Sequence, residues 1–446
     1  MTQETTSTLD VSTLDDAARA RVAVIDDLVW RGLVADSTDL EALRAAASAG
    51  PLTLYCGFDP TAPSLHFGNL LQILTVRRFQ LAGHRPLALV GGATGLIGDP
   101  KESGERTLND VEVVGEWVAR IRAQLERFFD FDGVENAAVM VNNYDWTQGL
   151  STLEFLRDVG KHFSVNRMLD REAVAARLAG AGISYTEFSY QLLQSYDYLQ
   201  LHRQYGCTLQ TGGSDQWGNI VAGVDLVRRV TGARVHALTT PLVTKADGTK
   251  FGKTETGTVW LDPGLMSPYA FFQFWLATDD DLAGPLLRMF SFRPHAEIEV
   301  LEQSLRERPQ AREVQRALAE ELTDLVHGAQ ERERVEAAAR ALFGRGEVGD
   351  LDAATLDAAL AEAPHAVVPA AEWAEGLGVA DALARAGLVT SKGAGRRAIA
   401  EGGAYVGNVR VTDEAAVLTD ADLLHGRWVL LRRGRRHIGG IRVDTP

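Results

Sequence analysis

The fold is decided by residues 52–69, which read LTLYCGFDPTAPSLHFGN. The apolar run Leu52–Cys56 predicts a buried strand, because short apolar runs bounded by glycine and proline are typical of strands in parallel sheets. Residues 57–64 predict a loop, and a helix is expected from Leu65 to about Leu81. A strand, a loop and a helix in this order are typical of one unit of a parallel α/β sheet.

The same order recurs in the first half of the chain. Further strands are predicted at 86–90, 208–211 and 235–238, with helices over much of 108–205. Each of these strands leads into a polar or glycine-rich loop. Because ligands of parallel sheets bind beyond the carboxyl ends of the strands, the sequence predicts an α/β fold with its site at that edge.

Composition divides the chain into further parts. Residues 25–266 are expected to form the parallel-sheet domain, and the Glu-, Arg- and Ala-rich stretch 267–345 predicts an α-helical domain. The Gly- and Ala-rich stretch 346–379 predicts a linker. Residues 380–446 are expected to form a small basic module, and residues 1–24 a mobile N-terminal tail.

Length and composition exclude several classes of protein. The chain has 446 residues, 46% of them hydrophobic, which is enough for sizeable cores and excludes a disordered or fibrous chain. No apolar run reaches the roughly 18 residues that a membrane span needs. The two cysteines, Cys56 and Cys207, exclude a disulfide scaffold and a multi-cysteine zinc site. With no secretory signal visible in Met1–Asp16, a cytoplasmic protein is predicted.

Charge is unevenly distributed along the chain. The formal net charge is −15, but residues 381–446 contain 11 basic and 7 acidic residues, so this segment carries +4 and the rest carries −19. A basic segment on an acidic protein is typical of an electrostatic footprint for a phosphate backbone. A chance imbalance on a solvated surface is the alternative.

Lysine is rare, and half of it lies in one loop. Only six of the 45 basic residues are lysines, and Lys245, Lys250 and Lys253 fall within nine residues. Lysine supplies a compact, flexible point charge that the planar fork of arginine does not replace. With Gly248 and Gly252 beside them, these lysines predict a mobile loop that handles phosphate, the alternative being a solvated turn.

Two further groups of polar residues are candidates for a site. Ser64, His66, Gly68 and Asn69 lie at the expected helix start, where free N–H groups and the helix dipole favour an anion, although an ordinary helix cap uses the same residue types. A second group consists of Tyr190, Gln194 and Asp197 on one expected helix face, and of Tyr55, Asp59, Asp99, Asp215 and Gln216 at or near strand ends. Together they predict a pocket rich in carboxylates and amides, unless they are an exposed stripe and ordinary turn residues.

These stretches resemble a known family. Ser64–Asn69 resembles the "HIGH" signature, and Lys250–Thr254 the "KMSKS" loop, of class I aminoacyl-tRNA synthetases. Residues 55–61, 189–197 and 212–219 resemble bacterial tyrosyl-tRNA synthetases in particular. The resemblance covers roughly residues 25–446 and implies a Rossmann-like catalytic domain. The class usually has Ile where this chain has Phe67, and Met and Ser where it has Phe251 and Gly252.

The resemblance implies roles for individual residues. At the amino acid it implies Tyr55 and Asp197 on the phenolic hydroxyl, Asp99, Tyr190 and Gln194 on the ammonium group, and Gln216 near the carboxylate. At the nucleotide it implies Gly57, Asp59, Gly68 and Asp215, with Thr61, His66, Asn69, Lys250 and Lys253 on the phosphates. Arg106 is a further candidate, but the loop Lys101–Arg106 departs from the family's spacing.

The implied reaction joins tyrosine to the 3′ end of tRNA(Tyr). The tyrosine carboxylate attacks the α-phosphate of ATP, and the tyrosyl group of the adenylate then moves to the terminal ribose. No protein nucleophile is required, and none is evident in the sequence. Mg²⁺ is expected with ATP as the substrate, with no metal-ligand set and no tightly bound cofactor in the protein. The family also implies a homodimer.

The basic module resembles a small RNA-binding module. The resemblance rests on residues 381–408 and implies that Lys392, Arg396, Arg397 and Arg410 bind phosphates. The run Arg432, Arg433, Arg435 and Arg436 has an alternative interpretation, because edge strands also use charge to stay soluble.

Two alternative functions stay open at this point. One is another enzyme of the same nucleotidyl-transfer superfamily, such as a tryptophanyl-tRNA synthetase or a small-acid adenylating ligase. The other is a non-catalytic RNA-binding paralogue that has kept the fold. The Tyr55 and Asp197 pair favours tyrosine, and the intact His66, Asn69 and Lys250 favour a working enzyme.

Overall fold

The computed structural model describes residues 13–100, 110–169, 172–180, 182–244, 251–254, 257–342, 348–434 and 437–444. The chain forms two compact units, which are treated separately below. The first comprises residues 1–262 and 281–300, and the second comprises residues 263–280 and 301–446. Residues 281–300 therefore belong to the first unit, although the sequence placed them in the helical domain.

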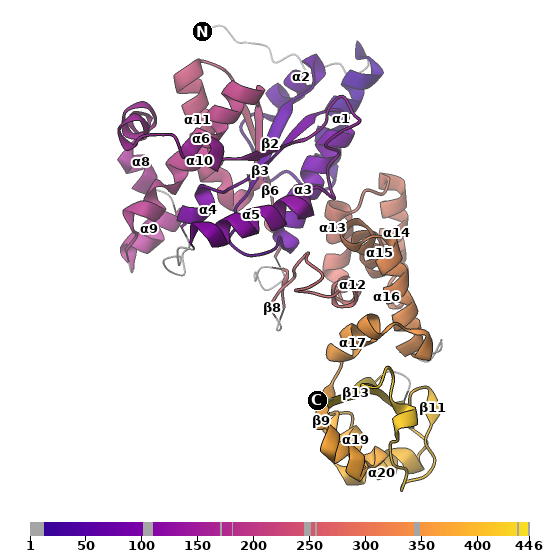
Figure 1. The fold of residues 1–446 in the computed structure, drawn as a ribbon. Coiled ribbons are helices and arrows are strands. Elements are labelled where there is room, and N and C mark those ends of the chain that lie inside the picture. Colours follow the sequence, from indigo (N-terminus) through magenta and orange to yellow (C-terminus); the bar gives the residue numbers. More distant parts are fainter. Residues whose placement is uncertain are drawn as a thin grey trace. The chain divides into compact units, whose positions relative to one another are not determined.

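A six-stranded sheet is the centre of the first unit (Figure 1). Its order is β1-β6-β5-β2-β3-β4, with β1 (Asp36–Ser37), β6 (His236–Thr240), β5 (Leu209–Gly213), β2 (Thr53–Phe58), β3 (Arg85–Val90) and β4 (Val139–Asn142). All neighbours are parallel except β1, which pairs antiparallel with β6. The α/β fold and the four predicted strands are confirmed, whereas β1 and β4 were not predicted.

The register places the middle of β2 at the centre of the sheet. Tyr55 pairs with Leu87 of β3 on one side and with Gln210 of β5 on the other. Because β2 to β6 are parallel, the loops that follow Phe58 and Val90 and the other strands leave the sheet at one edge. This is the edge where the sequence predicts a site.

Helices cover the sheet of the first unit. The longer ones are α1 (Asp16–Trp30), α2 (Leu40–Ala49), α3 (Phe67–Leu81), α5 (Val111–Leu125), α10 (Tyr185–Tyr205) and α11 (Trp217–Thr231). Helix α13 (Asp280–Phe290) also belongs to this unit apart from Asp280, and α14 (His295–Glu307) is divided between the two units after Val300. Shorter ones are α4 (Thr94–Ile97), α6 (Tyr144–Thr147), α7 (Thr152–Glu154), the π-helical turn Phe155–Val159, α8 (Val165–Leu169) and α9 (Glu172–Ala179). Figure 1 shows α10 and α11 side by side, and a core of side chains such as Leu87, Val141 and Tyr198 joins helices and strands.

The predicted N-terminal tail is shorter than expected. The sequence assigned residues 1–24 to a mobile tail, but α1 begins at Asp16. Asp15 caps this helix by accepting a hydrogen bond from the backbone N–H of Ala18 at 2.7 Å. Val22, Val24 and Ile25 are buried, so this segment is part of the core.

The second unit combines helices with a second sheet. Its helices are α12 (Pro268–Leu276), α15 (Glu313–His327), α16 (Ala329–Leu342), α17 (Ala353–Ala361), α18 (Ala370–Glu375), α19 (Val379–Arg385) and α20 (Lys392–Ala400). The five-stranded sheet has the order β11-β10-β12-β13-β9, with β11 (Val409–Arg410), β10 (Ala404–Val406), β12 (Trp428–Arg433), β13 (His437–Asp444) and β9 (His365–Pro369). The α-helical stretch and the α+β module are thus both present.

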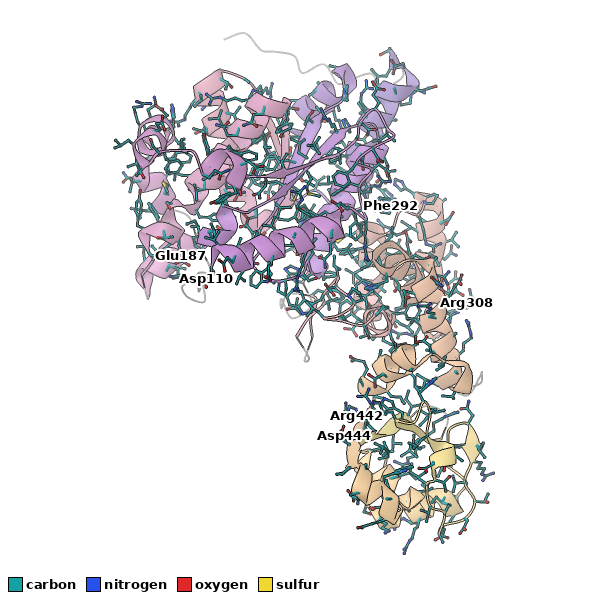
Figure 2. The ribbon with its side chains drawn as sticks, in the orientation of Figure 1. Asp110, Glu187, Phe292, Arg308, Arg442 and Asp444 are labelled. Carbon is teal, nitrogen blue, oxygen red and sulfur yellow. The ribbon has the colours of Figure 1, made fainter. Side chains whose placement is uncertain are left out.

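The linker predicted over 346–379 is wrong, because this stretch contains α17, β9 and α18. Strand β9 pairs in parallel with β13, with Val367 opposite Arg442 and Pro369 opposite Asp444. Figure 2 labels Arg442 and Asp444 of β13. Val368 is fully buried in the core of the module. Val367 and Val368 are β-branched residues that fit a half-buried pleated strand. Pro364 before β9 and Pro369 at its end obscured this signal in the sequence.

A small hairpin lies in the described part of the predicted lysine loop. It consists of β7 (Lys253–Thr254) and β8 (Gly257–Thr258). Among the described residues, no helix is both long and apolar enough to cross a membrane.

Candidate active site

The buried pair Tyr55 and Asp197 lies at the centre of the site. Tyr55 is 1% exposed, and its hydroxyl has no hydrogen-bond partner within the described part of the chain. Asp197 of α10 is 2% exposed. Burial, together with the Asp197 carboxylate, raises the pKa of Tyr55 well above its usual value, so its hydroxyl keeps its proton and can donate.

Two donors that the sequence did not predict hold the Asp197 carboxylate. Asn143 donates from Nδ2 to Oδ2, and Trp146 donates from Nε1 to Oδ1, both at 2.9 Å. Burial raises the pKa of Asp197 to about 7, although these two hydrogen bonds oppose that shift. The signal for Asn143 was the apolar run 139–141 followed by asparagine, which repeats the strand-then-polar pattern of the other loops.

A second cluster joins Asp59 to Tyr190. The Tyr190 hydroxyl donates to Oδ2 of Asp59 at 2.6 Å, and Thr94 donates from Oγ1 to Oδ1 at 2.6 Å. A Cβ on Gly91 would lie 2.0 Å from Oδ1 of Asp59, so only glycine fits there. Burial and the Asp59 carboxylate raise the pKa of Tyr190 well above its usual value. The sequence assigned the two residues to different ligand groups, and the structure brings them together.

A third cluster surrounds Asp99. Gln216 donates from Nε2 to Oδ2 of Asp99 at 2.9 Å, and Asn219 donates from Nδ2 to Oδ1 at 3.3 Å. Asn219 is fully buried on α11 and also donates to Oε1 of Gln216 at 3.0 Å, so it orients both predicted residues. Oε1 of Gln194 is a buried acceptor without a partner among the described side chains. Such orphaned polar atoms are rare in folded proteins and point to a ligand.

The start of α3 is a candidate anion-binding site at which the side chains of His66 and Asn69 already form capping hydrogen bonds. His66 is the N-cap residue, and its Nδ1 accepts from the backbone N–H of Gly68 at 3.0 Å. Asn69 accepts from the backbone N–H of His66 through Oδ1, also at 3.0 Å. The capping role and the predicted phosphate role coexist, because a neutral His66 with Nδ1 as acceptor carries its proton on Nε2.

The remaining predicted residues lie around this edge or outside the described residues. Gly57, Thr61, Gly68 and Asp215 are exposed, at the end of β2, in the loop after it, at the start of α3 and in the turn before α11. Lys250, the loop Lys101–Arg106 and residues 435–436 lie outside the described residues. Lys253 is described by its backbone alone.

The described residues hold no group of three or more His, Cys, Asp or Glu side chains arranged to bind a metal ion. The carboxylates of the site are instead bonded to protein donors, as Asp59, Asp99 and Asp197 show. The donor set therefore does not form a metal cage, and a magnesium ion at this site would come with the phosphates of a ligand.

In the module, four predicted cations are accessible. Lys392, Arg396 and Arg397 of α20 and Arg410 of β11 are exposed. Arg432 differs, because it is 6% exposed, stacks over Tyr405 at 5.4 Å and donates to Oδ1 of Asn408 at 2.8 Å. Its strand β12 lies between β10 and β13, so the interpretation of an edge strand is wrong for this residue.

Comparisons with known proteins show the family of the chain. Residues 47–344 match the model of the class I tRNA synthetases (W and Y), and residues 360–438 match that of the tyrosine–tRNA ligase SYY-like C-terminal domain. The tyrosine–tRNA ligase of Streptomyces avermitilis is 64% identical over 422 residues, which cover 94% of this chain and 99% of the relative. That of Mycobacterium tuberculosis is 58% identical over 421 residues, covering 94% and 98%.

Solved structures give the same result. A C-terminally truncated mitochondrial tyrosyl-tRNA synthetase of Aspergillus nidulans is 30% identical with a TM-score of 0.65, covering 72% of this chain and 94% of that one. A tryptophanyl-tRNA synthetase of Encephalitozoon cuniculi shares the fold, with a TM-score of 0.52 at 13% identity over 72% of this chain and 91% of that one. The chain therefore belongs to the tyrosine–tRNA ligase family of the class I tRNA synthetases.

Proposed function

We propose that the protein activates L-tyrosine with ATP and transfers the tyrosyl group to the 3′ end of tRNA(Tyr). The observation that carries the proposal is the buried pair of Tyr55 and Asp197. The Tyr55 hydroxyl is an unpartnered donor, and the Asp197 carboxylate is a fixed acceptor. The phenolic hydroxyl of a bound tyrosine can accept from the Tyr55 hydroxyl and donate to the Asp197 carboxylate at the same time.

The same pair explains the choice of tyrosine over phenylalanine. With phenylalanine bound, the Tyr55 hydroxyl would stay unpaired, which costs about 1–3 kcal/mol. The Asp197 carboxylate would also lack the third donor that the hydroxyl of tyrosine supplies, while keeping its bonds to Asn143 and Trp146. Asn143 and Trp146 keep the carboxylate in place when the pocket is empty, so tyrosine binds to a prearranged site.

The ammonium and carboxylate groups of tyrosine are proposed to lie at the second and third clusters. Oε1 of Gln194 is a buried acceptor without a hydrogen-bond partner among the described residues, and it would accept from the ammonium group. Asp99 supplies the negative charge, and Tyr190, oriented by its bond to Asp59, supplies a second oxygen. Gln216 is proposed to lie near the substrate carboxylate.

The phosphates of ATP are proposed to lie at the start of α3 and on the lysine loop. Gly57, Asp59, Gly68 and Asp215 would contact the nucleotide, and Thr61, His66, Asn69, Lys250 and Lys253 would bind its phosphates. The tyrosine carboxylate attacks the α-phosphate, the bond to pyrophosphate breaks, and no protein nucleophile takes part. Catalysis then rests on positioning and on charges that bind the transition state better than the ground state. Magnesium would arrive with ATP.

The module is proposed to bind tRNA through Lys392, Arg396, Arg397 and Arg410. We expect Arg396→Ala to lower tRNA affinity and to reduce the slope of log affinity against log salt by about 0.7–0.9, because one phosphate contact is lost. Tyrosine-dependent exchange without tRNA should stay unchanged. Filter binding at several salt concentrations checks this, with Arg120→Ala on α5 as the matched control. An unchanged slope for Arg396→Ala would remove this residue from the RNA site.

A homodimer in the cytoplasm completes the proposal. Several large apolar side chains between residues 153 and 178 are exposed, namely Leu153, Leu156, Val165, Leu169 and Leu178. Such a concentration is typical of surfaces that a partner covers, here a second copy of the chain. Both cysteines are buried and free, as in proteins of reducing compartments.

The first test is ATP–pyrophosphate exchange with each of the twenty amino acids in turn, without tRNA. Exchange with tyrosine alone supports adenylate chemistry and the pocket together. Exchange with tryptophan instead would keep the mechanism and discard the pocket. No exchange with any amino acid would favour a non-catalytic RNA-binding paralogue or an enzyme that requires its tRNA for activation, and adding tRNA to the assay separates these two.

A further inference from the structure

The described end of the lysine loop is hydrogen-bonded to the start of α3. The backbone N–H of Phe67 donates to the carbonyl of Val259, and that of Leu261 donates to the carbonyl of Leu65, both at 2.9 Å. Val259 in turn donates from its backbone N–H to the carbonyl of Gly252 at 3.1 Å. The two signature segments are therefore connected by a short ladder of backbone bonds.

Aromatic packing reinforces this connection. The rings of Phe67 and Phe251 lie edge to face, with 5.1 Å between their centroids and 61° between their planes. Phe67 is 4% exposed and Phe251 is 8% exposed. Phe290 of α13 packs on Phe67 as well, with 5.1 Å between centroids, so Phe67 has little room to move.

Gly252 has no room for a side chain. A Cβ there would lie 2.6 Å from Cδ1 and 2.9 Å from Cγ of Phe67, closer than real Cβ contacts come. The φ of Gly252 is +85°, in a region that also favours glycine. The backbone of the loop thus lies directly against the Phe67 ring.

The three departures from the class signatures are in mutual contact. Phe67 stands where the class usually has Ile, and Phe251 and Gly252 stand where it has Met and Ser. Residues far apart in the sequence thus meet in one place: a larger ring on α3, a larger ring on the loop, and a glycine that admits both.

We infer that Phe67, Phe251 and Gly252 form one interlocked contact that positions Lys253 for adenylate formation. Lys253 directly follows Gly252, so the contact bears on the backbone from which this lysine extends. The inference rests on the proposed function of this lysine. Because a displacement of about 1 Å can cost about 100-fold in rate, Phe67, Phe251 and Gly252 act as positioning residues.

The test measures the rate constant of tyrosyl-adenylate formation in single turnovers, together with tyrosine affinity. We expect Gly252→Ala to slow the step about 100-fold and Phe251→Leu about 10-fold, with the tyrosine dissociation constant within twofold of wild type. Phe79→Leu is the matched control, because it removes a fully buried ring from the same helix α3, where Phe79 packs on His84. It should lower the unfolding temperature while the adenylate step stays within twofold.

A double variant distinguishes an interlocked contact from two independent defects. Phe67→Ala removes the two atoms closest to a new Cβ, so Phe67→Ala/Gly252→Ala should be at least tenfold faster than the product of the two single effects predicts. Additive effects, a parallel loss of tyrosine affinity, or an equal defect in Phe79→Leu would overturn the inference. A wild-type protein that forms no adenylate from tyrosine and ATP would overturn the proposed function as well.

Discussion

The two ends of the site differ in how their side chains are held. At the end proposed to bind tyrosine, buried groups bond to one another, as Asp197 does with Asn143 and Trp146. At the end proposed to bind the phosphates, residues such as Thr61 and Gly68 are exposed, in a loop and at a helix start. One end is prearranged inside the core, and the other is arranged on the surface of the same unit.

From this difference we expect the buried end to determine which amino acid is selected, and the exposed end to determine the rate of adenylate formation. Buried polar groups discriminate between amino acids because leaving one unpaired is costly. Charges placed beside the phosphates can stabilise charge that develops only in the transition state. Changes at the two ends should therefore alter different quantities, and four experiments test whether they do.

The largest effect is expected at the phosphate end. Lys253→Ala should slow adenylate formation roughly 100- to 1,000-fold, because a charge that stabilises the transition state is lost. Tyrosine affinity should hardly change. Single-turnover kinetics with equilibrium dialysis of tyrosine measures both, and Lys161→Ala, an exposed lysine elsewhere in the unit, is the control. A large loss of tyrosine affinity in Lys253→Ala would contradict the separation.

The next effect is expected at the tyrosine end. Asp197→Asn should reduce the preference for tyrosine over phenylalanine about 10- to 100-fold, because a hydrogen bond to a charged group contributes about 1.5–3 kcal/mol. The preference is the ratio of kcat/KM values in pyrophosphate exchange, with the exposed Asp145→Asn as the control. Unchanged selectivity would discard the pocket assignment.

The buried carboxylate should also make stability depend on pH. Because the pKa of Asp197 is raised to about 7 in the folded protein, the unfolded chain binds fewer protons between about pH 4 and pH 7. The stabilisation associated with this group is complete below about pH 4 and is lost as the pH rises through 7.

Urea unfolding can measure this loss without substrates. Between pH 5 and pH 8, the free energy of unfolding of the wild type should fall by about 2 kcal/mol relative to Asp197→Asn. Asp145→Asn should follow the wild type. Parallel curves for wild type and Asp197→Asn would show that the carboxyl titrates as in the unfolded chain.

The smallest effect is expected from Asn219, which orients Asp99 and Gln216 without a proposed contact to the substrate. Asn219→Ala should raise the KM for tyrosine about 5- to 10-fold, the effect of losing one net hydrogen bond, with kcat nearly unchanged. Asn136→Ala is the control, because Asn136 also donates two bonds, to the carbonyls of Gln80 and His84. An equal drop in kcat would place Asn219 at the phosphate end instead.

Local patterns predicted the centre of the site and missed its supports. The strand ending at Phe58 and the helix after His66 follow from apolar runs and turn residues, which are properties of neighbouring residues. Asn143 and Asn219 are supports because of bonds to residues far away in the sequence, and such contacts leave no local periodicity. The roles at the phosphates came from the resemblance to a family.

The second unit shows the same limit. Strand β9 has only five residues, with Pro364 directly before it and Pro369 at its end, and its sheet partner β13 follows about 70 residues later. No local signal distinguishes such a strand from an extended linker, because pairing is decided by the tertiary fold.

The pairing of β9 with β13 has a consequence for how the module can be separated from the rest of the chain. A cut between Pro369 and Val379 would leave helices α19 and α20 with four strands and remove the fifth. The backbone of β13 would then present open hydrogen-bonding groups along its edge, beside Ile441 and Val443. An open edge of this kind recruits strands from other molecules, so a module cut there should aggregate, whereas one cut before His365 should stay monodisperse.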